Sequence, residues 1–216
     1  MNKKHALVIG ATGASGQEIV NLLLKDPNYD IVNIFVRRKI ERKDAKLNVY
    51  VIDFSQLHLY KELIKGDILF SALGTTIKNA GSKDKQYLVD YTYQYEFAKI
   101  ASENGVDTLS LISSIGANKK SVFFYPKIKG KLEESVKLLP FKKIQIYQPP
   151  SLIRQVELIR FGEKVSVKLF QWLNSVGLFK SLRPMSVSFL ASKIVSNSHL
   201  IKKDRVTTFK PIDIFN

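Results

Sequence analysis

The stretch at residues 5–18, HALVIGATGASGQE, decides the fold of this chain. It begins with the apolar run ALVI, which is typical of a parallel strand covered on both faces. Three glycines follow. Gly10 suits a tight turn, Gly13 lets a backbone N–H approach a diphosphate, and Gly16 lets a helix pack closely against the strand. The pattern therefore predicts a strand, a glycine turn and a helix whose first N–H groups and dipole hold phosphate.

The surroundings of the glycine triplet favour dinucleotide binding over a purely structural turn. The triplet follows the strand directly and opens an amphipathic helix, which Ser15 is expected to cap. The lysine of a P-loop is absent from the turn. The turn residues expected to contact the dinucleotide are Gly10, Thr12, Gly13, Ala14, Ser15 and Gly16.

The composition predicts a single globular domain, because the 216 residues are 45% hydrophobic and 25% charged. The sequence contains no cysteine, which excludes disulfides and thiolate metal sites and favours a reducing cytoplasm. Its three histidines are scattered, so we expect no metal site. No apolar run is long enough to span a membrane, and the N-terminal segment does not resemble a signal peptide.

The formal net charge of +15 predicts an anionic ligand, and a phosphate-rich cofactor is one. Nucleic acid is the other candidate. We disfavour it because no recognition-helix, zinc-finger or RNP-like pattern accompanies the charge, which is spread along the whole chain. A lysine-rich solvated surface is the better explanation of most of this charge.

The second predicted strand, at residues 31–36, is followed by Arg37 and Arg38. In dinucleotide folds the tip of this strand meets the adenosine ribose, where a carboxylate binds the free 2′-OH. A guanidinium in the same place can pair with a 2′-phosphate. The two arginines therefore favour NADP(H) over NAD(H), and the alternative is that both face solvent.

Two further strands are expected at residues 48–52 and 68–70. Asp53, next to Phe54, follows the first of them and either accepts a hydrogen bond from the adenine amino group or caps a helix at residues 57–64. The second strand leads into small residues that suit close approach of the cofactor, namely Ala72, Leu73, Gly74 and Thr75.

A loop at residues 75–82 is expected to precede a long helix at residues 83–104, which Gly105 ends. Several tyrosines on this helix are expected to pack or to form an interface, and they are also suited to a homodimer. They are Tyr87, Tyr91, Tyr93 and Tyr95.

A fifth strand at residues 109–112 runs into Ser113 and Ser114. Because proline is tolerated only near the start of a helix, Pro126 predicts a helix from about Tyr125 to residue 138. Tyr125 and Lys129 are four residues apart and would share one face of that helix.

A sixth strand at residues 144–147 completes an alternation of strands and helices. This predicts an α/β fold, a Rossmann-type doubly wound parallel sheet in the order 3-2-1-4-5-6. Residues 151–216 are expected to form a small helical cap on the substrate side, with an amphipathic stretch at 163–174, a helix at 186–198 and a strand at 206–209. Some apolar residues of this region suit a pocket wall, although core packing is the more common role; they are Phe161, Phe170, Trp172, Leu173 and Phe179.

Several motifs together resemble one family. They are the turn GATGASG, the arginine pair, LGT at residues 73–75, LISSIGA at residues 111–117, and YPKIKGKLEE at residues 125–134. In these motifs the chain resembles the atypical short-chain dehydrogenase/reductases, and most of all the branch of NAD(P)H-binding oxidoreductases related to the Tat-interacting-protein oxidoreductase and its small bacterial relatives. The resemblance covers most of the chain.

The resemblance implies catalytic roles for four residues. Tyr125 would donate a proton to the substrate carbonyl oxygen, or act as the base in the reverse direction. Lys129 would lower the pKa of Tyr125 and hold the nicotinamide ribose hydroxyls. Ser114 or Ser113 would donate a hydrogen bond to the same carbonyl oxygen, and Ser114 is preferred because the family's catalytic serine is usually the second of the pair.

The first functional hypothesis is therefore an NADP(H)-dependent oxidoreductase that acts on a small carbonyl or alcohol. A cofactor sensor that binds NADP(H) and changes its contacts with a protein partner is an alternative from another class. A nucleotide-sugar epimerase is a further alternative, disfavoured because the region after residue 150 is short for a sugar-nucleotide domain.

Overall fold

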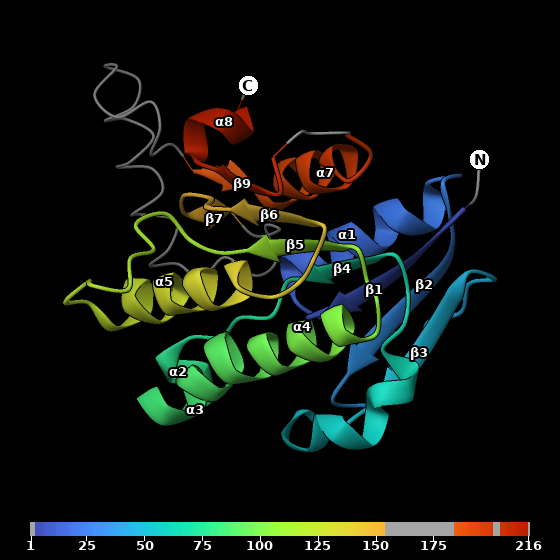
Figure 1. Ribbon diagram of the computed structural model, residues 1–216, viewed down its shortest axis with the longest axis horizontal. Coiled ribbons are helices and arrows are strands. Elements are labelled where there is room, and N and C mark those ends of the chain that lie inside the picture. Colours follow the sequence, from blue (N-terminus) through green and yellow to red (C-terminus); the bar gives the residue numbers. More distant parts are fainter. Residues whose placement is uncertain (1–2, 154–183, 201–203, 216) are drawn as a thin grey trace.

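The computed structural model describes residues 3–153, 184–200 and 204–215. Within these residues a parallel sheet of seven strands forms the centre, in the spatial order β3-β2-β1-β4-β5-β6-β9 (Figure 1). Its strands are β1 (Lys4–Ile9), β2 (Tyr29–Val36), β3 (Leu47–Val51), β4 (Ile68–Ser71), β5 (Thr108–Ile112), β6 (Lys143–Tyr147) and β9 (Val206–Phe209). The predicted order of the first six strands is confirmed, and each pair of neighbours is parallel.

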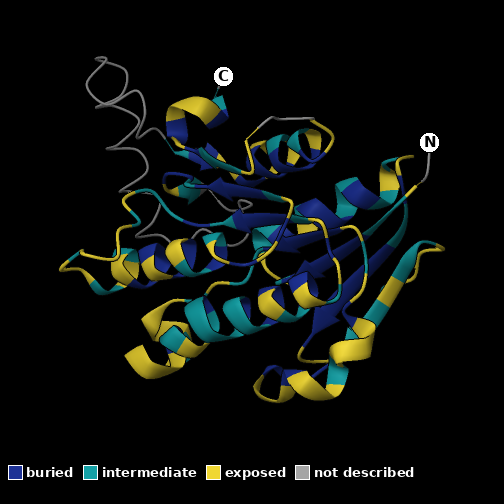
Figure 2. Cartoon of the chain, viewed as in Figure 1, coloured by how far each residue is buried: buried dark blue, intermediate teal, exposed yellow. Residues whose placement is uncertain are grey.

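Helices cover both faces of this sheet. α1 (Ala14–Lys25) packs beside α7 (Val187–Asn197) on one face, and α4 (Tyr93–Glu103) packs beside α5 (Phe124–Lys137) on the other (Figure 1). Successive residues of β1 serve opposite faces, with Ala6 and Val8 in the first core and Leu7 and Ile9 in the second. Figure 2 shows the resulting buried central strands between helices whose outer sides are exposed.

The C-terminal portion contains helices, as predicted, and parts of it complete the main fold. β9 pairs in parallel with β6 and adds a seventh strand. β7 (Leu152–Ile153) and β8 (Met185–Ser186) form a separate two-stranded sheet. The predicted amphipathic stretch at 163–174 lies outside the described residues, as do Phe161, Phe170, Trp172, Leu173 and Phe179.

The chain between β4 and β5 is more helical than expected. α2 (Ile77–Ala80) lies inside the predicted loop, because the Thr76 side chain accepts a hydrogen bond from the Asn79 N–H and caps a short turn. The predicted long helix consists of α3 (Lys83–Tyr87), the π-helical turn η2 (Leu88–Thr92) and α4. Gly105, with a φ of 83°, follows its C-terminal cap as predicted.

Two smaller differences concern short helices. The segment expected as a helix at residues 57–64 is a 3₁₀ helix, η1 (Phe54–Leu63), and its N-cap is Asp53. The short helix α8 (Pro211–Phe215) has a proline at its first position and was not predicted.

The glycine turn has the predicted form. Gly10 has a φ of 80°, and a Cβ there would lie 2.4 Å from the Ala72 carbonyl carbon in β4's exit. A Cβ on Gly16 would lie 2.1 Å from the Gly10 carbonyl oxygen. The prediction that Ser15 caps α1 is wrong, because the Gly13 N–H closes the turn on the Gly10 carbonyl at 2.9 Å and makes Gly13 the N-cap.

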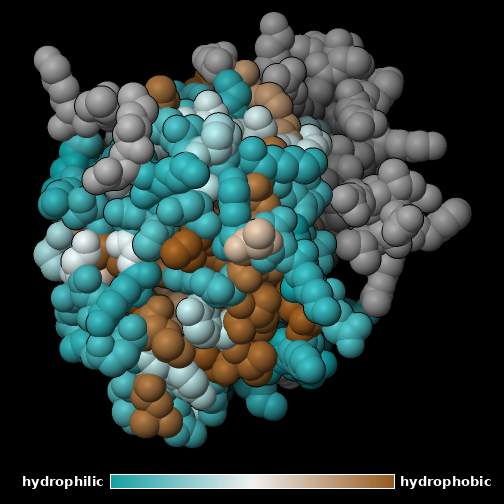
Figure 3. Space-filling view, turned by 90° about the vertical axis from the view of Figure 1, so that its right-hand side faces the viewer, coloured by the Kyte–Doolittle hydropathy of each residue, from teal (hydrophilic) through white to brown (hydrophobic). Residues whose placement is uncertain are grey.

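The surface is polar over most of the face seen in Figure 3, where hydrophilic side chains surround a hydrophobic area in the lower half. Among the helices of the described ranges, none has the length and hydrophobicity needed to cross a lipid bilayer.

Candidate functional site

Two hollows lie side by side along the edge of the sheet where the parallel strands end. The larger has a volume of about 920 Å³ and the smaller about 570 Å³. Six residues line both of them and join the two into one groove: Gly13, Ala72, Leu73, Gly74, Thr75 and Asn79. Ligands of doubly wound sheets bind at this edge, so the groove is the candidate site.

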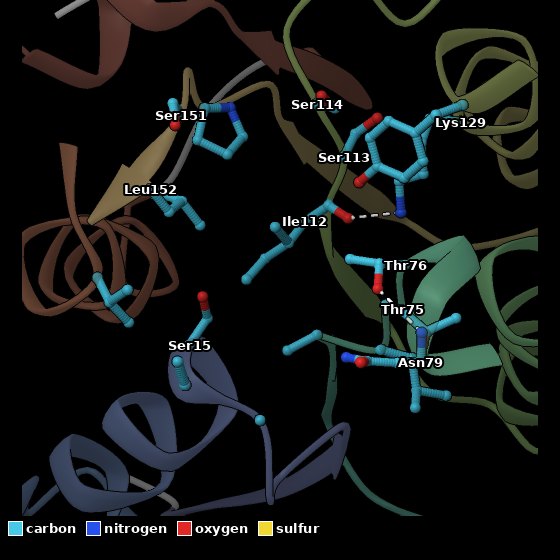
Figure 4. A pocket seen from close by; sticks show the side chains of 18 of the residues that line it. Ser15, Thr75, Thr76, Asn79, Ile112, Ser113, Ser114, Lys129, Ser151 and Leu152 are labelled. Carbon is cyan, nitrogen blue, oxygen red and sulfur yellow. Dashed lines mark hydrogen bonds between the residues drawn. The ribbon is translucent and has the colours of Figure 1, made fainter. Parts of the chain in front are cut away.

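The larger hollow brings together the predicted catalytic residues. Lys129 enters from α5, while Ser113 and Ser114 follow the end of β5 (Figure 4). Tyr125, also on α5, lines the same hollow. Ser15, at the start of α1, and Leu152 lie on the opposite side (Figure 4). Ala14 and Val187 also line this hollow. All four predicted catalytic side chains therefore line one wall of one hollow.

Lys129 is buried, with 1% of its surface exposed, and its Nζ donates a hydrogen bond to the Ile112 carbonyl oxygen at 3.1 Å (Figure 4). Burial lowers the pKa of Lys129, whereas the nearby carboxyl groups of Asp90 and Glu133 raise it. A buried ammonium needs such acidic neighbours to stay charged.

The hydroxyl of Tyr125 differs from the expectation for a base. Tyr125 is 38% exposed as a residue, yet burial around its phenol, together with the nearby Asp90 carboxyl, raises its pKa to about 12. A hydrogen bond with Ser114 acts in the opposite direction. The expected lowering of the Tyr125 pKa by Lys129 is not seen, and the Lys129 ammonium donates instead to the Ile112 carbonyl oxygen.

The two serines have different partners. The Ser113 hydroxyl donates to Oε1 of Glu133, and both groups are buried. The Ser114 hydroxyl is partly exposed, contacts the Ile115 carbonyl at 3.2 Å and hydrogen-bonds with Tyr125. Both serines line the larger hollow, and Ser114 is the one whose hydroxyl hydrogen-bonds with the phenol of Tyr125.

The smaller hollow contains part of the predicted adenosine site. Arg37, Phe54 and Thr12 line it, as does Gly10. Arg38 and Asp53 do not line either hollow. Oδ1 of Asp53 instead accepts hydrogen bonds from the N–H and hydroxyl of Ser55 at 2.8 and 2.7 Å, so of the two predicted roles the structure supports helix capping.

Two buried residues of the site were missed by sequence reasoning. Asp90 is 0% exposed, and its Oδ2 accepts from the Thr75 N–H at 3.0 Å, while Gln86 Nε2 donates to the Thr75 carbonyl at 3.0 Å. Together they hold the backbone N–H and the backbone carbonyl of Thr75, a residue that lines both hollows. A signal existed, because Gln86, Asp90 and Gln94 are spaced by four and continue the buried stripe of the helix.

The groove fits a bound dinucleotide. Glycines leave space beside the turn, and the first turn of α1 has N–H groups that no described side chain caps. Two buried acceptor atoms, Oδ1 of Asp90 and Oε1 of Gln86, have no hydrogen-bond partner within the described part of the chain. These features define a dinucleotide-binding Rossmann protein. Clusters of three or more metal-ligating side chains were not found among the described residues.

Comparison with known proteins agrees with this class. The sequence profile of a family described as NAD(P)H-binding matches residues 10–137. The chain is 33% identical over 174 residues to the mitochondrial protein FMP52 of Debaryomyces hansenii, covering 79% of this chain and 76% of that one. It is 32% identical over 174 residues to HTATIP2 of Rattus norvegicus, covering 79% and 72%. The chain belongs to this NAD(P)H-binding family, among the proteins similar to atypical short-chain dehydrogenase/reductases.

Solved structures show the same fold. A UDP-N-acetylglucosamine 4-epimerase from Methanobrevibacter ruminantium superposes with a TM-score of 0.69 at 14% identity, covering 96% of this chain and 76% of the epimerase. WbmG of Bordetella bronchiseptica, in a complex with NAD and UDP, gives a TM-score of 0.70 at 12% identity, covering 96% and 72%. At these identities the likeness concerns the fold alone.

Proposed function

We propose that this protein is an NADPH-dependent oxidoreductase that reduces the carbonyl group of a small molecule. One observation carries the proposal: Tyr125, Ser114 and Lys129 share a wall of the larger hollow, which continues past the glycine turn into the smaller hollow with Arg37. The groove thus offers a reaction centre at one end and a place for an adenosine at the other.

The charge of the smaller hollow supports NADP(H) over NAD(H). Arg37 lines it, and no carboxylate does so among the residues that the structure describes. NAD-binding sites of this fold usually place a carboxylate on the ribose 2′-OH, and that carboxylate would repel a 2′-phosphate. The carboxyl group of Asp53, the nearest acidic residue after β3, is occupied by Ser55.

Tyr125 can supply the proton that carbonyl reduction requires. A phenol with a pKa of about 12 is protonated at neutral pH and can serve as a general acid. When bound, NADPH supplies the hydride. Tyr125 would protonate the carbonyl oxygen, Ser114 would donate a hydrogen bond to the same oxygen, and buried Lys129 would bind polar groups of the cofactor and place a positive charge beside the site.

Calorimetric titration with NADPH and NADH in parallel tests the cofactor. We expect NADPH to bind more tightly, and Arg37→Gln to remove most of this preference while leaving NADH affinity unchanged. A screen of small carbonyl compounds, followed by NADPH consumption, then tests the reaction. Absence of binding by both cofactors would overturn the proposal.

A second function, an NADP(H) sensor without turnover, is favoured by the position of Lys129. Its Nζ is bonded to the Ile112 carbonyl and does not lower the pKa of Tyr125. Tyr125→Phe separates the two functions. If the variant loses NADPH oxidation and keeps its affinity for NADPH, the protein is a reductase. If the unmodified protein binds NADPH but oxidises it with none of the screened carbonyls, the protein is a sensor.

A further inference from the structure

We propose that Lys85 is a specificity-determining residue, which lines the smaller hollow together with Arg37 and binds the 2′-phosphate of NADP(H) there. This inference rests on the proposed cofactor preference. It adds a residue from outside the segment that directly follows β2, where residues that bind the adenosine ribose are usually sought. It also replaces Arg38 as the expected second cation of the phosphate site.

The two cations come from different elements. Arg37 directly follows β2, whereas Lys85 belongs to α3, which begins after the exit of β4. Both line the smaller hollow. The Ser82 side chain accepts from the Lys85 N–H at 3.1 Å and caps α3, so the backbone of Lys85 is held in the first helical turn.

Neither cation has an acidic partner in the part of the chain that the structure describes. Over the described ranges, no carboxylate forms an ion pair with Arg37 or Lys85, although lysines elsewhere do pair, such as Lys142 with Asp107. No described acidic residue lines the smaller hollow either. Two unpaired positive charges that face one hollow create a site for a dianion.

The other residues that line the smaller hollow indicate which dianion fits. Its apolar lining includes Phe54, Leu88 and Val89, which suit a planar base. The diphosphate that NAD and NADP share is expected at the start of α1, on the other side of the glycine turn. The phosphate that belongs beside a base and away from that helix is the 2′-phosphate, which NADP has and NAD lacks.

Arg38 is a less suitable partner, although it is next to Arg37 in the sequence. All three cations are exposed, but Arg38 lines neither hollow, whereas Arg37 and Lys85 line the smaller one. Both arginines lie in the bend that follows β2, and of the two only Arg37 reaches the hollow. A second cation therefore has to come from another element, and α3 supplies it.

Calorimetric titration of the full-length protein with 2′,5′-ADP and 5′-ADP, and with NADPH and NADH, tests this assignment. Lys85→Gln removes the charge, Arg38→Gln tests the competing assignment, and Lys99→Gln on the exposed side of α4 controls for loss of one positive charge. We expect Lys85→Gln to weaken 2′,5′-ADP and NADPH by about tenfold, since a charge-assisted contact to phosphate is lost. The affinities for 5′-ADP and NADH should stay within about twofold in every variant.

Each other outcome overturns the assignment. Equal weakening of NADPH and NADH by Lys85→Gln would mean that Lys85 covers the base. If Arg38→Gln lost more affinity for NADPH than Lys85→Gln, the second cation of the phosphate site would be Arg38. If Lys99→Gln lost as much affinity as Lys85→Gln, the effect would be one of net charge alone. These results differ from failure of the proposed function, in which the unmodified protein binds neither NADPH nor NADH.

Discussion

The buried carboxylate of Glu133 accepts a hydrogen bond from the Ser113 hydroxyl, and Nε2 of Gln148 donates to both of its oxygens at 3.0 Å. Glu133 thereby ties α5 to the ends of β5 and β6. It also lies one turn from Lys129, whose charge it favours. Because Ser113 is engaged in this network, Ser114 is left as the hydroxyl that can serve a substrate.

Ser114→Ala and Ser113→Ala should therefore have opposite signatures. Ser114→Ala is expected to lower kcat by about 10²-fold with little change in Tm, because one donor to the developing oxyanion is lost. Ser113→Ala is expected to lower the free energy of unfolding by about 1–3 kcal/mol, because a buried carboxylate loses a donor. Steady-state kinetics and thermal unfolding check both. A larger loss of kcat in Ser113→Ala, with its Tm unchanged, would reverse the assignment.

Tyr125→Phe is expected to reduce kcat by about 10³-fold, since general acid catalysis contributes in this range, and to leave the Kd for NADPH unchanged. The acid is active when protonated, so titration of Tyr125 reduces the rate only as the pH rises toward about 12. The pH profile for reduction should therefore show no decline due to Tyr125 between pH 6 and about 9. A decline in that interval that disappears in Tyr125→Phe, measured from the residual rate, would contradict the high pKa.

The sequence predicts the nucleotide-binding half of the fold well because its signals are local. A glycine with positive φ beside a neighbouring strand, as at Gly10, has few substitutes, and strand order follows from the alternation of strands and helices. The pairing of Tyr125 with Lys129 could also be predicted, because residues four apart on a helix lie on one face.

The burial of the acidic residues could not be predicted from the sequence in the same way. A carboxylate in a helix is usually an exposed residue, and whether Asp90 or Glu133 is buried depends on which helix face meets the sheet. For Asp90 the four-residue spacing with Gln86 and Gln94 shows which residues share a face, but not that this face packs against the sheet, and the π-helical turn at Leu88–Thr92 is not visible in the sequence. Lys85 lines a hollow together with residues that follow β1, β2 and β4, such as Gly10, Arg37 and Ala72, which is a tertiary relationship that helix periodicity cannot predict.

Gly10→Ala tests the close approach that positions the glycine turn. Gly81→Ala is a matched control, because both glycines have a positive φ, 80° and 87°, but a Cβ at Gly81 has no atom within 4 Å. The control should cost about 1 kcal/mol for the left-handed backbone alone. Gly10→Ala should cost clearly more and abolish cofactor binding, because its Cβ would meet the Ala72 backbone. Urea unfolding measures both, and equal losses would show that the close approach does not matter.

The buried phenol of Tyr29 should make the free energy of unfolding fall at alkaline pH. It is fully buried, its hydroxyl lies 2.8 Å from the Ser198 Oγ, and burial raises its pKa to about 12. The folded protein therefore holds this proton more tightly than the unfolded chain, whose tyrosines titrate near pH 10. The stabilisation is fully present below about pH 10 and is lost as the pH rises through about 12, at about 1.4 kcal/mol per pH unit.

Tyr29→Phe should remove this contribution to the slope. Between pH 10 and about 12, its free energy of unfolding should fall less steeply than that of the unmodified protein, followed by circular dichroism in urea. Ser198→Ala is the control, because it removes the hydrogen bond and keeps the ionisable phenol, so its slope should stay steep while its stability at pH 8 falls by about 1 kcal/mol. If Tyr29→Phe and Ser198→Ala had the same slope, the alkaline loss of stability would belong to other groups, of which Tyr125 and Tyr147 have raised pKa values too.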